Sequence, residues 1–497
     1  MTKTQIISLV VVGLLTVLSG FFIFWKSKKH TGFKCLALLL FLAVALTWIF
    51  PYGYYQGAEY YEYGMQYQGI FDIPNIMYYA ISFGCDKIIF LILLGVFYAI
   101  LSKCNGYKKL VHNIAKRFEG MEVVFSIFVS LFLVALTVLL NQTFMVLVFV
   151  PFLVSILLNM KFDKISTFSV TFGSILVGIL GTLYGTEGLL GFGDYTGINS
   201  TDSILWRLLI LVAAFVIFNF INILHIKKNL KENKKVNEEK EDPFKVENVK
   251  DGKTWPIIVV LALVFIITIL GFVGWSNYFN IKCFDEFHNY LYGLTIGEEK
   301  SFFIFKELLG KVNADKALGT WTLFHGSIIL AFFSIILGLC NRIKFDEFVD
   351  AADEGIKKFG KSIGLFVMVY MIFAIGYLCP FIPSILNVMF KGGSHFNPYL
   401  VSLGALISNL TYTDLGFVGY LVGSFFTGSY GTNLSVLHTI FVSTYGLLQI
   451  IGPTSAIMLI GLGYLDIDYK SWIKYIWIFA VSMLVILILV FTLMTYV

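Results

Sequence analysis

The sequence predicts an all-α protein that crosses a membrane several times. Of its 497 residues, 58% are hydrophobic and 13% are charged, whereas about 25% of the residues in a typical soluble domain are charged. The charges are also segregated, because residues 123–160 contain none. A soluble fold of this size cannot bury so much apolar surface, and uncharged apolar runs of this length are typical of membrane-spanning helices. Continuous apolar runs also exclude a membrane β-barrel, in which apolar residues alternate.

The first spans fix the orientation of the chain. They are predicted at residues 5–25, 33–50 and 87–102. Lys26, Lys28 and Lys29 follow the first span, and a basic segment at 103–120 follows the third, whereas residues 51–86 contain no Lys or Arg. Since basic residues collect in cytoplasmic loops, we expect 26–32 and 103–120 in the cytoplasm and 51–86 outside.

A strongly charged stretch divides the chain into two halves. Residues 225–253 contain nine Lys and seven acidic residues, which is typical of a solvated, flexible linker. We therefore predict a first membrane half at 1–224, a cytoplasmic linker at 225–253 and a second membrane half at 254–497.

The topology of the second half stays open at this point. A simple inversion would place residues 341–362 outside, whereas spans at 254–274 and 321–340 would place them in the cytoplasm. A further short element within 275–320 would reconcile the two arrangements.

Small and polar residues interrupt the uncharged blocks of both halves. The interruptions are LNQTF at 140–144, GTLYGTEG at 181–188, FTGSYGTNLS at 426–435 and IIGPTSA at 450–456. Interrupted backbone is tolerated in hydrocarbon only where it is buried in protein or lines a cavity, and paired interruptions are typical of a transporter binding site. The predicted substrate-binding residues are Asn141, Gln142, Thr143, Gly181, Thr182, Thr427, Gly428, Ser429, Thr432, Asn433, Pro453, Thr454 and Ser455.

Two acidic residues stand beside these interruptions. Glu187 and Asp414 are candidates for ion coupling, because an ionisable side chain at membrane depth is costly and is usually functional. No Lys or Arg falls inside the interruptions, so an anion would be held by hydroxyls, amides and helix N-termini. The alternative is that both acids lie in solvated loops. We predict no cofactor and no metal site, with Na⁺ or H⁺ as the coupling ion.

Three sequence motifs resemble one transporter family. They are PTSAIMLIGLGYLDIDYKSWIKY at 453–475, TGSYGTN at 427–433 and IIFLILLGVFYAILSKCNGY at 88–107. In these motifs the chain resembles the bacterial anaerobic four-carbon dicarboxylate carrier family, in its YfcC-like branch of the ion transporter superfamily. The resemblance implies a two-repeat, elevator-like carrier with broken helices and re-entrant hairpins, whose tips would lie near 141–143 and 427–433. It also implies a homodimer.

The functional hypothesis is therefore secondary active transport. The substrate would be a small carboxylate-bearing solute, a dicarboxylate or an amino acid, moved across the bacterial plasma membrane by an ion gradient or by exchange. The chain has no motif for nucleotide binding or hydrolysis. A membrane-embedded enzyme of cell-envelope polysaccharide synthesis and a channel remain as alternatives. No nucleic-acid partner is expected, because the lysines lie in loops, as membrane orientation requires.

Overall fold

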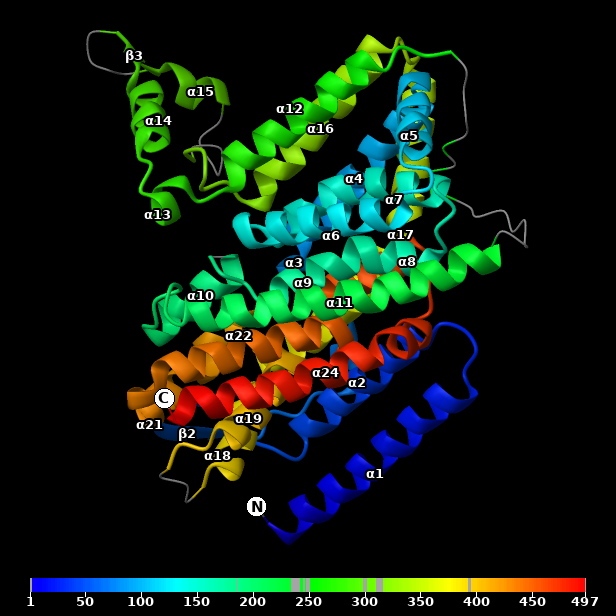
Figure 1. Ribbon diagram of the computed structural model, residues 1–497. Helices are drawn as coiled ribbons and strands as arrows, with labels where there is room; N and C mark the ends of the chain where they lie inside the picture. Colours follow the sequence, from blue (N-terminus) through cyan, green and yellow to red (C-terminus); the bar gives the residue numbers. More distant parts are fainter. Residues whose placement is uncertain are drawn as a thin grey trace.

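The structure is a helical membrane protein. It is a computed structural model that describes residues 2–496 except 185, 234–241, 245, 247–250, 298–301, 310–315 and 392–394. Within these ranges, nine helices are long and apolar enough to cross a membrane, and most of them lie side by side with similar inclination in Figure 1. The predicted polytopic helical fold is confirmed. Two short antiparallel strand pairs lie in the connections.

In the described part of the first half there are eleven α-helices. Its elements are α1 (Lys3–Lys26), α2 (Thr31–Thr47), β1 (Tyr52–Gln56), β2 (Glu59–Gly64), η1 (Ile70–Asp72), α3 (Ile73–Phe83), α4 (Cys85–Lys103), α5 (Asn105–Arg117), α6 (Glu122–Leu139), η2 (Thr143–Phe149), α7 (Val150–Asn159), α8 (Lys164–Phe168), η3 (Ser169–Gly173), α9 (Ser174–Leu180), α10 (Glu187–Thr196) and α11 (Ile204–Asn233).

The second half begins with α12 and ends with α24. Its elements are α12 (Trp255–Phe272), α13 (Trp275–Phe279), α14 (Cys283–Gly293), β3 (Thr295–Ile296), β4 (Phe302–Phe303), α15 (Ile304–Leu309), α16 (Leu323–Cys340), α17 (Phe345–Leu378), α18 (Ile382–Met389), α19 (Pro398–Thr411), α20 (Leu415–Val418), η4 (Gly419–Gly423), α21 (Ser424–Tyr430), η5 (Gly431–Asn433), α22 (Leu434–Ile451), α23 (Ala456–Tyr464) and α24 (Tyr469–Tyr496).

Both halves contain the same series of elements. The first hairpin consists of α6 followed by η2 and α7. It precedes the first broken helix, in which α8, η3 and α9 are separated from α10 by residues 181–186. The second hairpin consists of α19 followed by α20, η4 and α21. It precedes the second broken helix, in which residues 452–455 separate α22 from α23. A long helix, α11 or α24, closes each half.

The second series runs in the opposite direction through the membrane. The first hairpin starts and ends beside α5 at the cytoplasmic end, since α6 follows α5 directly and α7 packs against it. The second hairpin starts where the hydroxyls of Tyr399 and Thr492 hydrogen-bond at 2.9 Å. It ends against the outer β1–β2 turn, because Gly428 packs against Gly57 and Ala58. An inverted pair of repeats is typical of secondary carriers.

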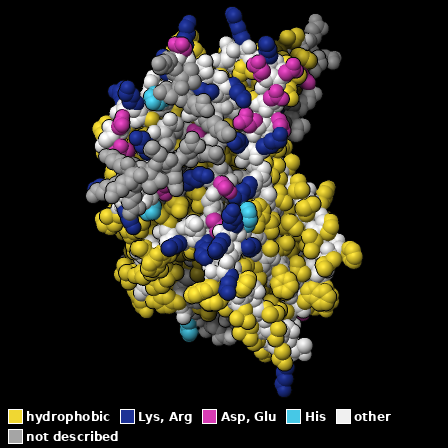
Figure 2. Space-filling view, turned by 90° about the vertical axis from the view of Figure 1, so that its right-hand side faces the viewer, with side chains coloured by type: hydrophobic (Ala, Val, Ile, Leu, Met, Phe, Trp, Pro, Cys, Tyr) yellow, Lys and Arg dark blue, Asp and Glu magenta, His cyan; other side chains and the backbone are white. Residues whose placement is uncertain are grey.

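The cytoplasmic end is recognised by its charges. Figure 2 looks onto this end and shows Lys, Arg, Asp and Glu side chains gathered on it above apolar flanks. The backbone amide of Thr31 donates a hydrogen bond of 2.9 Å to the Asp468 carboxylate, which places the start of α24 beside the basic segment after α1. Basic residues at one end are the pattern that the positive-inside rule requires.

The structure resolves the open topology of residues 341–362. Lys103 at the end of α4 forms a 3.1 Å ion pair with Glu354 in α17, so both residues lie at the cytoplasmic end. Residues 275–320 contain only short elements among those described, and none of these is long enough to span a membrane. The charged stretch at 345–362 is thus the cytoplasmic extension of α17, and it is not the counterpart of the amphipathic α5, as simple inversion would require.

The predicted linker is partly structured. α11 continues to Asn233, eight residues beyond the predicted boundary at 225, and residues 234–241 lie outside the described part. Further along, Phe244 is buried and its ring lies 6.1 Å from that of Tyr98 and 6.2 Å from that of Tyr464. Charge counting misses this anchor because the buried aromatic residue lies among many charged ones.

The inverted arrangement predicts the accessibility of two engineered positions. In a cysteine-free background, a cysteine restored at 283 in the outer α14 should react with a membrane-impermeant maleimide added to intact cells. Glu347→Cys in the charged extension of α17 should react only after the cells are opened, because that extension lies at the cytoplasmic end. Reaction of the Glu347→Cys variant on intact cells would show that this topology is wrong.

Candidate functional site

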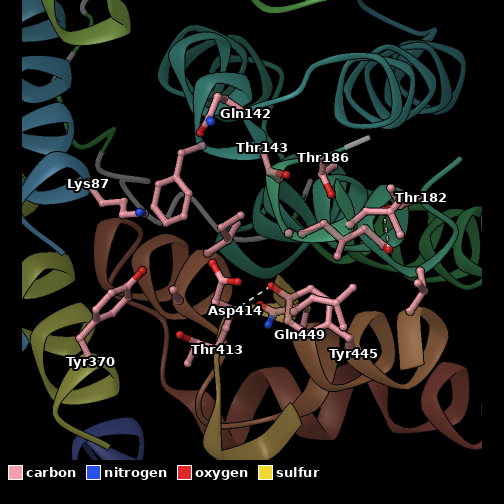
Figure 3. Close-up of a pocket in the computed structure, with 18 residues that line it drawn as sticks. Lys87, Gln142, Thr143, Thr182, Thr186, Tyr370, Thr413, Asp414, Tyr445 and Gln449 are labelled. Atoms are coloured by element: carbon pink, nitrogen blue, oxygen red, sulfur yellow. Dashed lines mark hydrogen bonds between the residues drawn. The ribbon is translucent and has the colours of Figure 1, made fainter. Parts of the chain in front are cut away.

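The candidate site is a small polar cavity between the two halves. Its volume is about 100 Å³. Its wall includes Thr143 at the start of η2, Gly188 in the first turn of α10, Leu415 at the start of α20 and Ala456 at the start of α23. Four interrupted segments therefore begin their helices at one cavity (Figure 3). A helix start carries the positive end of the helix dipole and backbone N–H groups that need partners outside the helix.

The side chains at the tip of the first hairpin lie in two different environments. Gln142 and Thr143 line the cavity. Asn141 points away, because its backbone amide donates to the Phe272 carbonyl at 2.8 Å and its side-chain Nδ2 donates to the Gly319 carbonyl at 3.2 Å. Asn141 therefore fastens the hairpin to the second half and lies outside the cavity wall, which differs from its predicted place in the site.

The first broken helix is held open by a buried arginine. Thr182 lines the cavity, and its carbonyl accepts a hydrogen bond of 2.7 Å from Arg207 Nη1. Arg207 is fully buried in α11, and its Nη2 donates to the carbonyl oxygens of Ser200 and Asp202. Gly181, in contrast, is needed for packing, since a Cβ there would overlap Leu211. The sequence gives no local sign of this arrangement, because Arg207 follows Thr182 by 25 residues.

The second hairpin contributes Thr413 and Asp414 to the cavity. Asp414 precedes α20, and its carboxylate accepts a 3.0 Å hydrogen bond from the Phe417 amide, which is the geometry of a helix N-cap. The Thr413 carbonyl accepts a 3.0 Å hydrogen bond from the Tyr445 hydroxyl. Figure 3 shows the carboxylate of Asp414 directed into the cavity. Glu187, the other predicted coupling residue, is the first residue of α10, and its side chain is outside the described part.

The turn at 427–433 differs from the predicted hairpin tip. Thr427, Gly428, Ser429, Thr432 and Asn433 do not line the cavity. Gly428 packs against the outer β1–β2 turn, and the Thr432 hydroxyl donates to Asn433 Oδ1 at 3.0 Å. This turn joins the second hairpin to α22 at the outer surface, whereas the tip inside the protein is the turn at 412–414. A run of Gly, Ser, Thr and Asn suits both kinds of turn, so composition did not distinguish them.

Residues that flank the break in the second broken helix line the cavity, whereas those of the break itself do not. Ser455 caps α23, since its hydroxyl accepts a bond of 3.4 Å from the Met458 amide, as expected from its place after Pro453. Its hydroxyl also donates to Gln449 Oε1 at 3.0 Å. Gln449, Ala456 and Ile457 line the cavity, whereas Pro453, Thr454 and Ser455 lie behind it.

One basic residue in the cavity wall was missed from the sequence. Lys87 lines the cavity from α4, which belongs to neither hairpin, and its ammonium forms a 3.1 Å ion pair with Asp86. Tyr370 of α17 lies on the same side (Figure 3). The only sequence signal was that Lys87 is the first residue of a predicted span, where a basic residue at the outer end is unusual.

The fold and the cavity together are typical of a membrane carrier, because inverted repeats bring interrupted helices to one site within the membrane. The chain belongs to the C4-dicarboxylate anaerobic carrier family, whose model matches residues 14–424. Membership of a carrier family makes this chain a carrier and excludes the enzyme and channel alternatives.

Comparison with solved structures gives a more distant likeness. The chain is similar to the YdaH transporter of Alcanivorax borkumensis, a structure described as having an unusual topology. Sequence identity is 10%, the TM-score is 0.40, and the match covers 93% of this chain and 97% of that one. No curated protein matches the chain.

Removing the buried arginine should disturb the cavity. Hydrogen bonds to charged groups contribute about 1.5–3 kcal/mol each, and Arg207→Gln loses those to Thr182 and to the carbonyls at 200 and 202. We expect at least a roughly tenfold loss of substrate affinity and a lower midpoint of thermal unfolding in detergent. Arg342→Gln, which changes an exposed arginine after α16, is the matched control. Identical affinities and midpoints in the two variants would refute a positioning role for Arg207.

Proposed function

We propose that this chain carries a four-carbon dicarboxylate across the bacterial plasma membrane by secondary active transport. The observation that carries the proposal is the convergence of four helix starts on one cavity. Each helix start favours negative charge by about 0.3–1 kcal/mol at exposed sites and more where it is partly buried. The family to which the chain belongs is named for carriage of C4-dicarboxylates.

The side chains in the wall support an anionic substrate. Gln142 and Thr143 supply an amide and a hydroxyl group, and Lys87 adds an ammonium. A dicarboxylate has two charged ends, so one end can be held by the helix starts and the hydroxyls while the other reaches toward Lys87. Charge-assisted hydrogen bonds of this kind are shorter and stronger than neutral ones.

Asp414 supports coupling to a cation. Its carboxylate faces the same cavity as the proposed dianion, and like charges in one site repel each other. A proton or Na⁺ on Asp414 would remove that repulsion, so substrate and cation would bind together. Glu187 remains the second candidate for this role, and the homodimer implied by the resemblance remains a prediction.

An amino acid is the second candidate substrate, and Asp414 favours it as well. An α-ammonium group could pair with Asp414 while the carboxylate meets the helix starts. The Asp414→Asn variant distinguishes the two candidates. In an amino-acid carrier it removes the partner of the substrate's ammonium group, whereas in a dicarboxylate carrier it removes only the cation site.

Transport by proteoliposomes tests the proposal directly. Purified protein should accumulate radiolabelled succinate when a proton gradient, a Na⁺ gradient or internal dicarboxylate is imposed, without ATP. Asp414→Asn should abolish the dependence on the cation gradient while exchange of dicarboxylate continues. Uptake of amino acids with no uptake of dicarboxylates would reverse the choice of substrate, and uptake that requires ATP would contradict secondary transport.

Two threonine variants distinguish a binding site in the cavity from one at the outer turn. Thr143→Ala removes a hydroxyl from the cavity wall, so the KM for succinate should rise about tenfold or more, as expected for loss of a hydrogen bond to a charged group. Thr432→Ala removes an exposed hydroxyl from the 427–433 turn and should leave KM unchanged. The opposite result would move the binding site to the outer turn, and the amount of folded protein, measured by size-exclusion chromatography, serves as the control for both.

A further inference from the structure

A second cavity lies between the first hairpin and α12, and it shares no lining residue with the polar site. The two elements touch at one end, where Leu140 bridges to Val273 and the Asn141 amide donates to the Phe272 carbonyl. Toward the cytoplasmic end a cavity of about 730 Å³ separates α12 from α6 and α7. The hairpin and α12 therefore form a wedge that opens toward the cytoplasmic half of the membrane.

Aromatic rings close the deep end of this wedge. The ring centroids of Phe132 and Phe149 lie 6.0 Å and 5.6 Å from that of Phe265. At the other end, Phe118 and Phe125 pack with their ring centroids 4.8 Å apart. The rest of the wall is almost wholly Phe, Leu, Ile, Val and Ala.

The cavity is suited to hydrocarbon rather than to water or a polar solute. The Tyr98 hydroxyl, one of its few polar groups, already donates to the Val148 carbonyl. An apolar cavity of about 150 Å³ stays dry and accepts apolar guests, and this one is larger. Phe128 lines it and is 65% exposed, so the cavity is open to the surrounding lipid.

One charged residue, an arginine, lines the mouth of the wedge. Arg117, the last residue of the amphipathic α5, lines the cavity and is exposed at the cytoplasmic end. Lys116 precedes it in the last turn of the same helix. Basic groups between helices on the cytoplasmic side are the pattern that recognises anionic lipid headgroups, and the planar guanidinium suits a phosphate.

The geometry points to a binding site for one anionic phospholipid of the cytoplasmic leaflet. An acyl chain fills the wedge between α12 and the first hairpin, and the headgroup phosphate meets Arg117. The lipid replaces the packing contacts that the hairpin and α12 do not make with each other. This inference is independent of the substrate proposed for the polar cavity.

Lipid retention by the purified full-length protein tests the site. The protein is incubated in detergent with a mixture of phosphatidylglycerol and phosphatidylcholine, passed over a size-exclusion column and analysed by native mass spectrometry. Ala262→Trp places an indole in the cavity, whereas Val259→Trp places one on the exposed side of α12, outside the wall. The control for Arg117→Gln is Arg342→Gln, which changes an exposed arginine that does not line the cavity.

We expect wild type, Val259→Trp and Arg342→Gln to retain one phosphatidylglycerol per chain, and Ala262→Trp to lose it. Arg117→Gln should keep a lipid but lower the preference for phosphatidylglycerol over phosphatidylcholine about fivefold. Equal retention by the two tryptophan variants, or no preference between the lipids in wild type, would overturn the proposal. If Ala262→Trp does not yield monodisperse protein, Leu261→Phe in the same wall gives a smaller change with the same expected direction.

Discussion

Satisfaction of interrupted backbone inside the membrane is the constraint on which this structure depends. Every break in a helix frees N–H and C=O groups, and lipid cannot satisfy them. In this fold four helix starts face one cavity, and side chains form hydrogen bonds with other backbone groups at the breaks. Arg207 donates a hydrogen bond to the Thr182 carbonyl, and Tyr445 donates one to the Thr413 carbonyl. The Ser455 hydroxyl caps α23. The side chains that satisfy the breaks therefore also hold the cavity wall in place.

The two hairpins approach this cavity from opposite sides because the second series of elements is inverted. The two walls of the cavity are of different kinds. The hairpin tips and broken helices supply amides, hydroxyls and Asp414, whereas α4 and α17 supply Lys87 and Tyr370. If the hairpins slide against a fixed part, as the resemblance implies, the contacts to Lys87 and Tyr370 are the ones that would change.

Several features were predictable from the sequence because they depend on local chemistry. The membrane class, the cytoplasmic end and the interruptions at 140–144, 181–188 and 450–456 follow from hydropathy, lysine placement and helix-breaking residues. The tip at 412–414 was missed because Tyr-Thr-Asp contains no Gly or Pro, while the Gly-rich turn at 427–433 resembled a tip more closely. Lys87 and Arg207 were missed because each reaches the site from a helix distant in sequence, and only packing brings them there.

The central claim is that the helix starts at Thr143, Gly188, Leu415 and Ala456 bind one anion between them. A cryo-electron microscopy map of the protein in lipid nanodiscs, recorded with and without saturating succinate, tests this claim most directly. The account predicts ligand density that appears only with succinate, within hydrogen-bond distance of Gln142, Thr143 or Thr182. Succinate density beside 427–433, with an unchanged cavity between the four helix starts, would contradict it.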